Sequence, residues 1–133
     1  MKKALVCGAG GFIGKNIVFN KQFTACFKPV ACYRKKPNIY PPNTEILVGD
    51  LCNPKDLAGL FDGVDSVIHL AGVSITANLS PKEKSDRIEL FMNMTDAMLE
   101  ELCKSKVKRV LWLSSTTGYP SRSCPLTEDM FFQ

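Results

Sequence analysis

The most informative stretch of this sequence is Ala4-Leu5-Val6-Cys7-Gly8-Ala9-Gly10-Gly11-Phe12-Ile13-Gly14. Four apolar residues closed by glycines predict a short buried strand, and the pattern from residue 12 onward predicts a helix. The glycines at positions 8, 11 and 14 allow a phosphate to approach the backbone, where a Cβ would otherwise intervene. The start of a helix also offers unpaired N–H groups and a partial positive charge. We therefore predict a phosphate-binding loop, with a glycine-rich turn that has no ligand as the alternative.

Short apolar runs alternate with longer helical patterns along the rest of the chain. Strands are predicted at residues 4–7, 29–33, 45–49, 65–70 and 108–113. Helices are predicted at 12–22, at 55–61 after an Asn53-Pro54 start, and at 81–104 with Ser80 as N-cap. Almost wholly apolar strands that alternate with helices indicate a parallel sheet covered on both faces. We predict a doubly wound α/β fold of about five strands, forming one domain over residues 1–133.

Composition excludes several classes of protein. The chain has 133 residues, with 17 Lys and Arg against 13 Asp and Glu, so its formal net charge is +4. That charge is too small and too evenly spread to predict nucleic-acid binding, and no apolar run approaches the ~18 residues that span a membrane. The amino-terminal residues are too polar for a signal peptide, so we expect a cytoplasmic protein.

Six cysteines and one histidine raise the question of a metal site or a disulfide framework. The cysteines lack the close pairs of a zinc site, so no metal is expected. Three of them lie in or beside apolar strand-like runs, which favours reduced, mostly buried thiols over disulfides. The histidine, His69, is predicted to be a strand-end residue with a structural hydrogen bond.

The glycine loop resembles that of the short-chain dehydrogenases/reductases, and Gly-Phe-Ile-Gly at 11–14 is similar to their extended branch of nucleotide-sugar epimerases, dehydratases and reductases. The resemblance implies a Rossmann fold that binds a nicotinamide dinucleotide. It implies that Asp50, with Leu51 beside it, contacts the adenine amine, and that Ala71 and Gly72 lie against the cofactor. Loop contacts to the cofactor are implied for Gly8, Gly10, Gly11, Phe12, Ile13 and Gly14.

The segment Leu113-Ser114-Ser115-Thr116-Thr117-Gly118-Tyr119-Pro120 resembles the catalytic serine segment of this family. The resemblance implies that Ser115 is the catalytic hydroxyl, with a slip to Ser114 or Thr116 left open, and that Thr117 assists. Together with residues 77–81 and 125–128, the segment is similar to the GDP-L-fucose synthase and GDP-mannose 3,5-epimerase corner of the family. Thr117 stands where the synthases carry a catalytic cysteine.

The family also uses a tyrosine whose pKa is lowered by a lysine four residues later. Tyr33, Tyr40 and Tyr119 all lack that lysine, and in the family the pair would follow beyond Gln133. The sequence therefore resembles the amino-terminal part of an enzyme, ending before the later strands and the substrate domain. A nucleotide-sugar substrate is expected only in a complete enzyme. The alternatives are a non-catalytic module that binds or senses a dinucleotide, and an inert fragment with an open sheet edge.

The end of the second strand favours NADP over NAD. NAD sites place Asp or Glu about 20 residues beyond the glycine loop, where it accepts hydrogen bonds from ribose hydroxyls. Here the strand ends in Tyr33-Arg34-Lys35-Lys36, with no carboxylate nearby. Arg34, with Lys35 as a neighbour, would pair with a 2′-phosphate. A solvated basic turn is the alternative.

The helix predicted at 81–104 has two apolar stripes. One consists of Phe91, Met94, Met98 and Leu102, and the other of Ile88, Met92, Leu99 and Cys103. One stripe must cover the sheet. The other either forms a homodimer surface, as the resemblance implies, or packs under elements absent from this chain.

Overall fold

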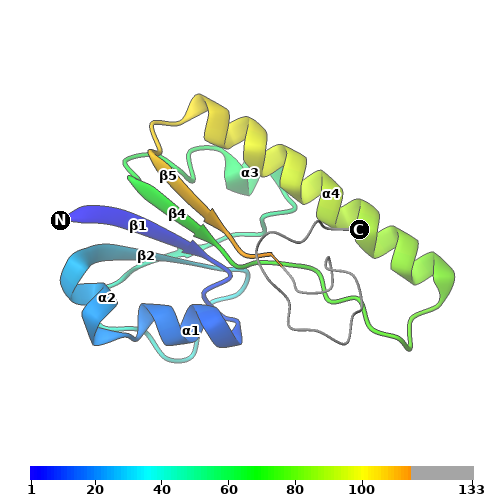
Figure 1. Cartoon of the computed structure of the whole chain (residues 1–133), viewed down its shortest axis with the longest axis horizontal. Helices are drawn as coiled ribbons and strands as arrows, with labels where there is room; N and C mark the ends of the chain where they lie inside the picture. Colours follow the sequence, from blue (N-terminus) through cyan, green and yellow to red (C-terminus); the bar gives the residue numbers. More distant parts are fainter. Residues whose placement is uncertain (115–133) are drawn as a thin grey trace, which may run out of the picture.

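A five-stranded parallel sheet carries helices on both of its faces (Figure 1). The computed structural model describes residues 1–114. Its strands are β1 (Lys2–Cys7), β2 (Phe27–Tyr33), β3 (Glu45–Val48), β4 (Ser66–His69) and β5 (Arg109–Trp112). Its helices are α1 (Phe12–Val18), α2 (Lys21–Cys26), α3 (Pro54–Leu57) and α4 (Pro81–Lys104). The predicted doubly wound α/β fold is confirmed.

The strand order β3-β2-β1-β4-β5 shows that the chain begins in the middle of the sheet. It builds outward through β2 and β3, then crosses back to add β4 and β5 on the other side of β1. The connections leaving β1 and β4 therefore diverge to opposite faces of the sheet. In open α/β sheets, the crevice at such a switch point is where ligands bind.

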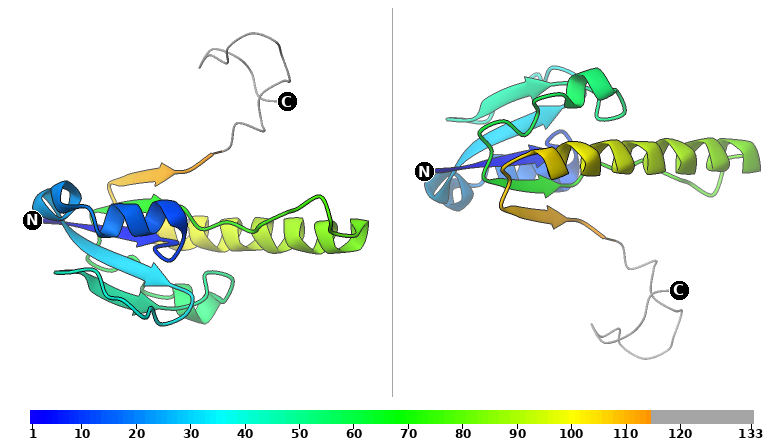
Figure 2. Two further views of the ribbon diagram at one scale, coloured as in Figure 1. Left: turned by 90° about the horizontal axis from the view of Figure 1, so that it is seen from below. Right: turned by 90° about the horizontal axis from the view of Figure 1, so that it is seen from above.

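Helices lie on both faces of the sheet (Figures 1 and 2), and alternate strand residues pack against them in two separate core layers. Val6 and Ala31 face α1 and α2, and they pack with Val18 of α1. The neighbouring positions, Leu5 among them, face α3 and α4, where the buried Met98 packs on the sheet. Because successive strand side chains point to opposite faces, each strand serves both layers.

The single helix predicted at 12–22 is wrong, because Asn20 divides it in two. Asn20 is the N-cap of α2, and its side-chain oxygen accepts a hydrogen bond of 3.0 Å from the backbone N–H of Phe23. An asparagine competes with the helix backbone in this way and therefore favours a helix start over a helix interior. The second strand consequently begins at Phe27, two residues earlier than expected.

The helix predicted at 55–61 is also too long, although its start is confirmed. Asn53 caps α3 through a bond from Lys55 N–H, and Pro54 opens the helix. It ends at Leu57, and Gly59 then adopts a φ of +75° that a right-handed helix cannot contain. The first strand also begins two residues earlier than predicted, at Lys2, and β3, β4 and β5 end within one residue of the predicted bounds.

The longest helix, α4, begins and ends where the sequence predicts. Ser80 and Glu83 form a reciprocal capping box, in which the Glu83 carboxylate accepts from the Ser80 backbone N–H at 2.8 Å. The first apolar stripe covers the sheet, with Met94 and Met98 buried. The second stripe is exposed, and the amino-terminal half of α4 projects beyond the strands (Figure 1). No helix within residues 1–114 is both long and apolar enough to cross a membrane.

The thiols divide between the core and the surface. Cys7 and Cys32 are buried and Cys52 is partly buried, whereas Cys26 and Cys103 are exposed. All five are free, so the expectation of mostly buried thiols is wrong for the two that lie on helix surfaces. No cluster of metal-ligating side chains occurs in the part of the chain that the structure describes.

Candidate functional site

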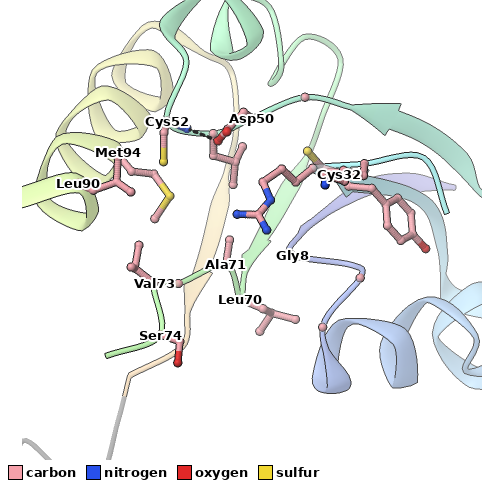
Figure 3. A pocket seen from close by; sticks show the side chains of 18 of the residues that line it. Gly8, Cys32, Asp50, Cys52, Leu70, Ala71, Val73, Ser74, Leu90 and Met94 are labelled. Atoms are coloured by element: carbon pink, nitrogen blue, oxygen red, sulfur yellow. Dashed lines mark hydrogen bonds between the residues drawn. The ribbon is translucent and has the colours of Figure 1, made fainter. Parts of the chain in front are cut away.

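A pocket of about 960 Å³ opens at the carboxyl ends of β1, β2 and β4 (Figure 3). The segment that follows β3 and one side of α4 complete its walls. Eight of the eleven residues predicted to contact a cofactor line this pocket: Gly8, Gly10, Gly11, Arg34, Asp50, Leu51, Ala71 and Gly72. They come from four different connections of the fold, and the parallel sheet brings those connections to one edge.

Three predicted cofactor residues lie outside the pocket lining. The side chains of Phe12 and Ile13 are exposed to solvent, with exposed fractions of 85% and 44%. Gly14 is buried behind the loop. The two predicted catalytic residues, Ser115 and Thr117, lie outside the described residues.

Two glycines are required by backbone packing. Gly8 has a φ of +84°, and a Cβ there would lie 2.7 Å from the backbone nitrogen of Ala71. Gly14 lies so close to the loop that a Cβ would sit 2.3 Å from the carbonyl oxygen of Gly8. These contacts seat α1 against the end of β1, and they bring the ends of β1 and β4 together beneath the pocket.

Gly10 and Gly11 keep the loop free of side chains where it faces the pocket. The Gly11 N–H donates to the Gly8 carbonyl at 3.0 Å, which holds the loop in a tight turn. A Cβ on Gly11 would meet only that carbonyl, at 3.4 Å, and one on Gly10 would touch the ring of Tyr33, also at 3.4 Å. Burial of that ring raises the pKa of the Tyr33 hydroxyl. The missing side chains leave backbone exposed to a ligand rather than making room for another part of the protein.

The segment after β3 is held by a pair of carboxylates. The Asp50 backbone N–H donates to Asp56 Oδ2 at 2.8 Å, and the Cys52 N–H donates to Asp50 Oδ1 at 3.0 Å. These bonds fix the direction of the Asp50 carboxylate at the pocket wall (Figure 3). Asp56, which the sequence reasoning did not single out, is the residue that anchors this segment.

Cations outnumber carboxylates in the pocket lining. Among the described lining residues, Arg34, Lys35 and Arg87 contribute positive charge, and Asp50 contributes the one negative charge. Within residues 1–114, Arg34 takes part in no ion pair. Arg87 comes from α4 and donates to the backbone carbonyl of Ser74, which ties the helix to the loop after β4. Sequence reasoning missed Arg87 because only the packing of α4 brings it to the pocket.

His69 is buried beside the pocket with its ring against Trp112, the two ring centroids 4.1 Å apart. Neither ring nitrogen has a hydrogen-bond partner among the described residues, so the structural hydrogen bond predicted for His69 is not found there. Burial lowers the pKa of His69 to about 4, and the imidazole is therefore neutral near pH 7.

Comparison with known proteins finds sequences that are similar to this chain. Residues 4–131 match the model of the NAD dependent epimerase/dehydratase family. The chain is 28% identical over 120 residues to the decarboxylating sterol-4-alpha-carboxylate 3-dehydrogenase of Mus musculus, a match that covers 87% of this chain and 30% of that protein. It is 25% identical over 120 residues to a 3 beta-hydroxysteroid dehydrogenase/Delta 5-->4-isomerase of Mycobacterium tuberculosis, covering 86% and 32%.

Solved structures share the fold. Uronate dehydrogenase from Agrobacterium tumefaciens matches with a TM-score of 0.77 and 23% identity, over 100% of this chain and 48% of that one. UDP-glucose 4-epimerase from Bifidobacterium longum, solved with NAD+ and UDP, matches with a TM-score of 0.82 and 21% identity, over 99% and 43%. The chain thus spans about a third of the length of these curated relatives and under half of these solved chains.

Proposed function

The chain belongs to the NAD dependent epimerase/dehydratase family, and from this we propose that its pocket binds NADP. The observation that carries the proposal is that three features meet at one pocket: loop backbone without side chains, an arginine with no ion pair within residues 1–114, and a carboxylate oriented by a hydrogen bond. Each of these suits a different part of a dinucleotide. When bound, a nicotinamide dinucleotide supplies hydride transfer.

The residues of the pocket fit this ligand in order along the sheet edge. The backbone of Gly10 and Gly11 would take the pyrophosphate, because no Cβ covers it. Asp50, whose Oδ1 already accepts from the Cys52 N–H, would use its other oxygen for the adenine amine. Leu51 and Ala71 would supply apolar contacts to the rings. Phe12, Ile13 and Gly14 form the start of α1, and we propose that they contact the cofactor through their backbone there.

Arg34 supports NADP rather than NAD. It follows the last residue of β2, lines the pocket and has no carboxylate partner among the described residues. A guanidinium in this place would make paired, charge-assisted hydrogen bonds to a 2′-phosphate. An NAD site would instead carry a carboxylate at the end of this strand.

We further propose that residues 1–133 form the dinucleotide-binding part of an oxidoreductase that acts on a nucleotide sugar in the cytoplasm. In that enzyme Ser115, with Thr117, would hydrogen-bond the reacting oxygen. The relatives are named for sterol, steroid and sugar substrates alike, so similarity in this region supports the cofactor and not the substrate. The exposed stripe of α4 would form the homodimer surface, and size-exclusion chromatography tests this directly.

A titration of the purified chain with NADPH and then NADH, followed by nucleotide fluorescence, tests the cofactor proposal. We expect saturable binding that favours NADPH and is lost in Gly11→Val, whose side chain would occupy the pyrophosphate position. Arg34→Asp should weaken NADPH and leave NADH nearly unchanged; Lys36→Asp, outside the pocket lining, is the matched charge control. Equal affinity for the two nucleotides would contradict the role of Arg34.

A binding or sensing module without catalysis is the second candidate. It is favoured by one observation, that none of the three tyrosines has a lysine four residues later. This candidate requires NADPH binding without turnover. Oxidation of NADPH by the 133-residue chain in the presence of a sugar nucleotide would exclude it.

A further inference from the structure

Three polar side chains lie in one row beneath the pocket, on the sheet face that α4 covers. Cys7 of β1 is paired in register with Cys32 of β2 on one side and with His69 of β4 on the other. Cys7 and Cys32 belong to one buried cluster, and their exposed fractions are 0% and 3%. The two thiols therefore lie side by side in the core, on neighbouring strands, and the proposed binding of a dinucleotide assigns them no task.

The register places the two cysteines at disulfide distance. Neighbouring strands lie about 4.8 Å apart, within the Cα separation of roughly 4.4–6.8 Å that a disulfide spans. The neighbouring thiols perturb each other, because Cys32 together with burial raises the pKa of Cys7, whereas Cys7 lowers the pKa of Cys32. No other two cysteines within residues 1–114 are paired in this way.

The two sulfurs differ in access. Cys32 lines the pocket (Figure 3), so a small solute in the pocket can reach it. Cys7 is not part of the pocket lining and is fully buried. Cys32 is also the thiol with the lowered pKa, because the neighbouring Cys7 thiol stabilises its thiolate. Oxidisable thiol pairs combine an accessible, low-pKa thiol with a second thiol close enough to form a disulfide with it. Cys32 and Cys7 match these two roles.

We propose that Cys7 and Cys32 are a redox-active thiol pair, oxidised to a disulfide by peroxide that enters through the pocket. The Cys32 thiolate attacks one peroxide oxygen, the O–O bond breaks, and hydroxide leaves while Cys32 becomes a sulfenic acid. The Cys7 sulfur then attacks the Cys32 sulfur; the S–S bond forms, the S–O bond breaks, and water leaves with the Cys7 proton. Overall, two thiols lose two electrons and two protons, and peroxide is reduced to two waters.

The disulfide would act on the glycine loop. A disulfide brings its Cβ atoms to about 3.8 Å, closer than the spacing of the strands, so it draws the ends of β1 and β2 together. Gly8 follows Cys7 directly, and the Ala9 N–H donates to the Cys32 carbonyl at 3.2 Å. The loop therefore moves with this pair, and oxidation should weaken nucleotide binding. This consequence rests on the proposed function, whereas formation of the disulfide does not.

The test treats the full chain with hydrogen peroxide, alkylates the remaining thiols and maps linked peptides by mass spectrometry. We expect a Cys7–Cys32 link in the wild-type chain and none in Cys32→Ser. The exposed Cys26 and Cys103 serve as internal references for the dose of oxidant. Oxidation of these two while Cys7 and Cys32 stay reduced would overturn the proposal, and this comparison needs no variant to fold.

A second arm repeats the reaction with NADP⁺, which carries no hydride to consume peroxide. At a concentration tenfold above its Kd, about one site in ten is free, so the link should form about tenfold more slowly. Unchanged linkage despite measured NADP⁺ binding would refute oxidation through the pocket. Linkage in a chain that binds no nucleotide would instead contradict the proposed function and leave the thiol pair standing.

Discussion

The contact between Gly14 and the loop leads to a quantitative prediction about stability. Replacing Gly14 by alanine places a Cβ 2.3 Å from the Gly8 carbonyl oxygen and 2.7 Å from the Cα of Ala9. Both neighbours are backbone atoms of the loop, so no side-chain rotation relieves the overlap. The start of α1 must therefore move away from β1 by about 1 Å, the shortfall from ordinary van der Waals contact.

Two opposing effects set the magnitude. Alanine is favoured over glycine inside a helix by about 1 kcal/mol, because glycine loses more backbone entropy on folding. Overpacking of a well-packed site costs roughly 1–3 kcal/mol, and the upper end applies here because the clashing atoms are backbone. We expect Gly14→Ala to lower the free energy of unfolding by about 2 kcal/mol.

Urea denaturation followed by circular dichroism measures this difference. With a slope of about 2 kcal/mol per molar urea, the midpoint should fall by about 1 M. The matched control is Gly72→Ala, because a Cβ on Gly72 meets nothing within 4 Å; its free energy of unfolding should stay within about 0.5 kcal/mol of wild type. Equal midpoints for the two variants would refute the packing argument for Gly14.

Three further changes test the core, the buried imidazole and the carboxylate anchor. Met98→Ala should lower the free energy of unfolding by about 2–5 kcal/mol in the same assay, since Met98 is fully buried, whereas Met92→Ala, 52% exposed, should change it little. The lowered pKa of His69 means that, as the pH falls, the unfolded chain binds a proton first. The contribution of His69 to stability should therefore be complete above about pH 6.5 and decline toward pH 4, by about 3 kcal/mol in all. His69→Leu should remove that contribution from a pH series of urea midpoints; an unchanged pH profile would count against the buried neutral imidazole. Asp56→Ala removes the acceptor for the Asp50 N–H and should weaken NADPH several-fold in the fluorescence titration, and full affinity would show that the segment needs no anchor.

Local patterns in the sequence predicted most of the fold. Asn53-Pro54 and Ser80-Pro81 marked two helix starts correctly, because capping depends on residues within one turn of each other. The division at Asn20 was missed because the same asparagine can cap a helix or lie exposed within one. Nothing local distinguishes these outcomes when apolar residues continue on both sides.

The sequence by itself determined the parallel α/β fold, the glycine loop and the grouping of Gly8, Arg34, Asp50 and Ala71 as ends of strands. Strand ends of a parallel sheet meet at one edge, so order along the chain was enough to place them together. Only the tertiary structure decided what depends on register and on packing across elements. The strand register places Cys7 beside both Cys32 and His69, and the packing of α4 brings Arg87 to the pocket. Burial leaves the His69 ring without a hydrogen-bond partner among the described residues. These contacts join residues far apart in the chain, and their positions follow from how whole strands and helices pack rather than from any local pattern.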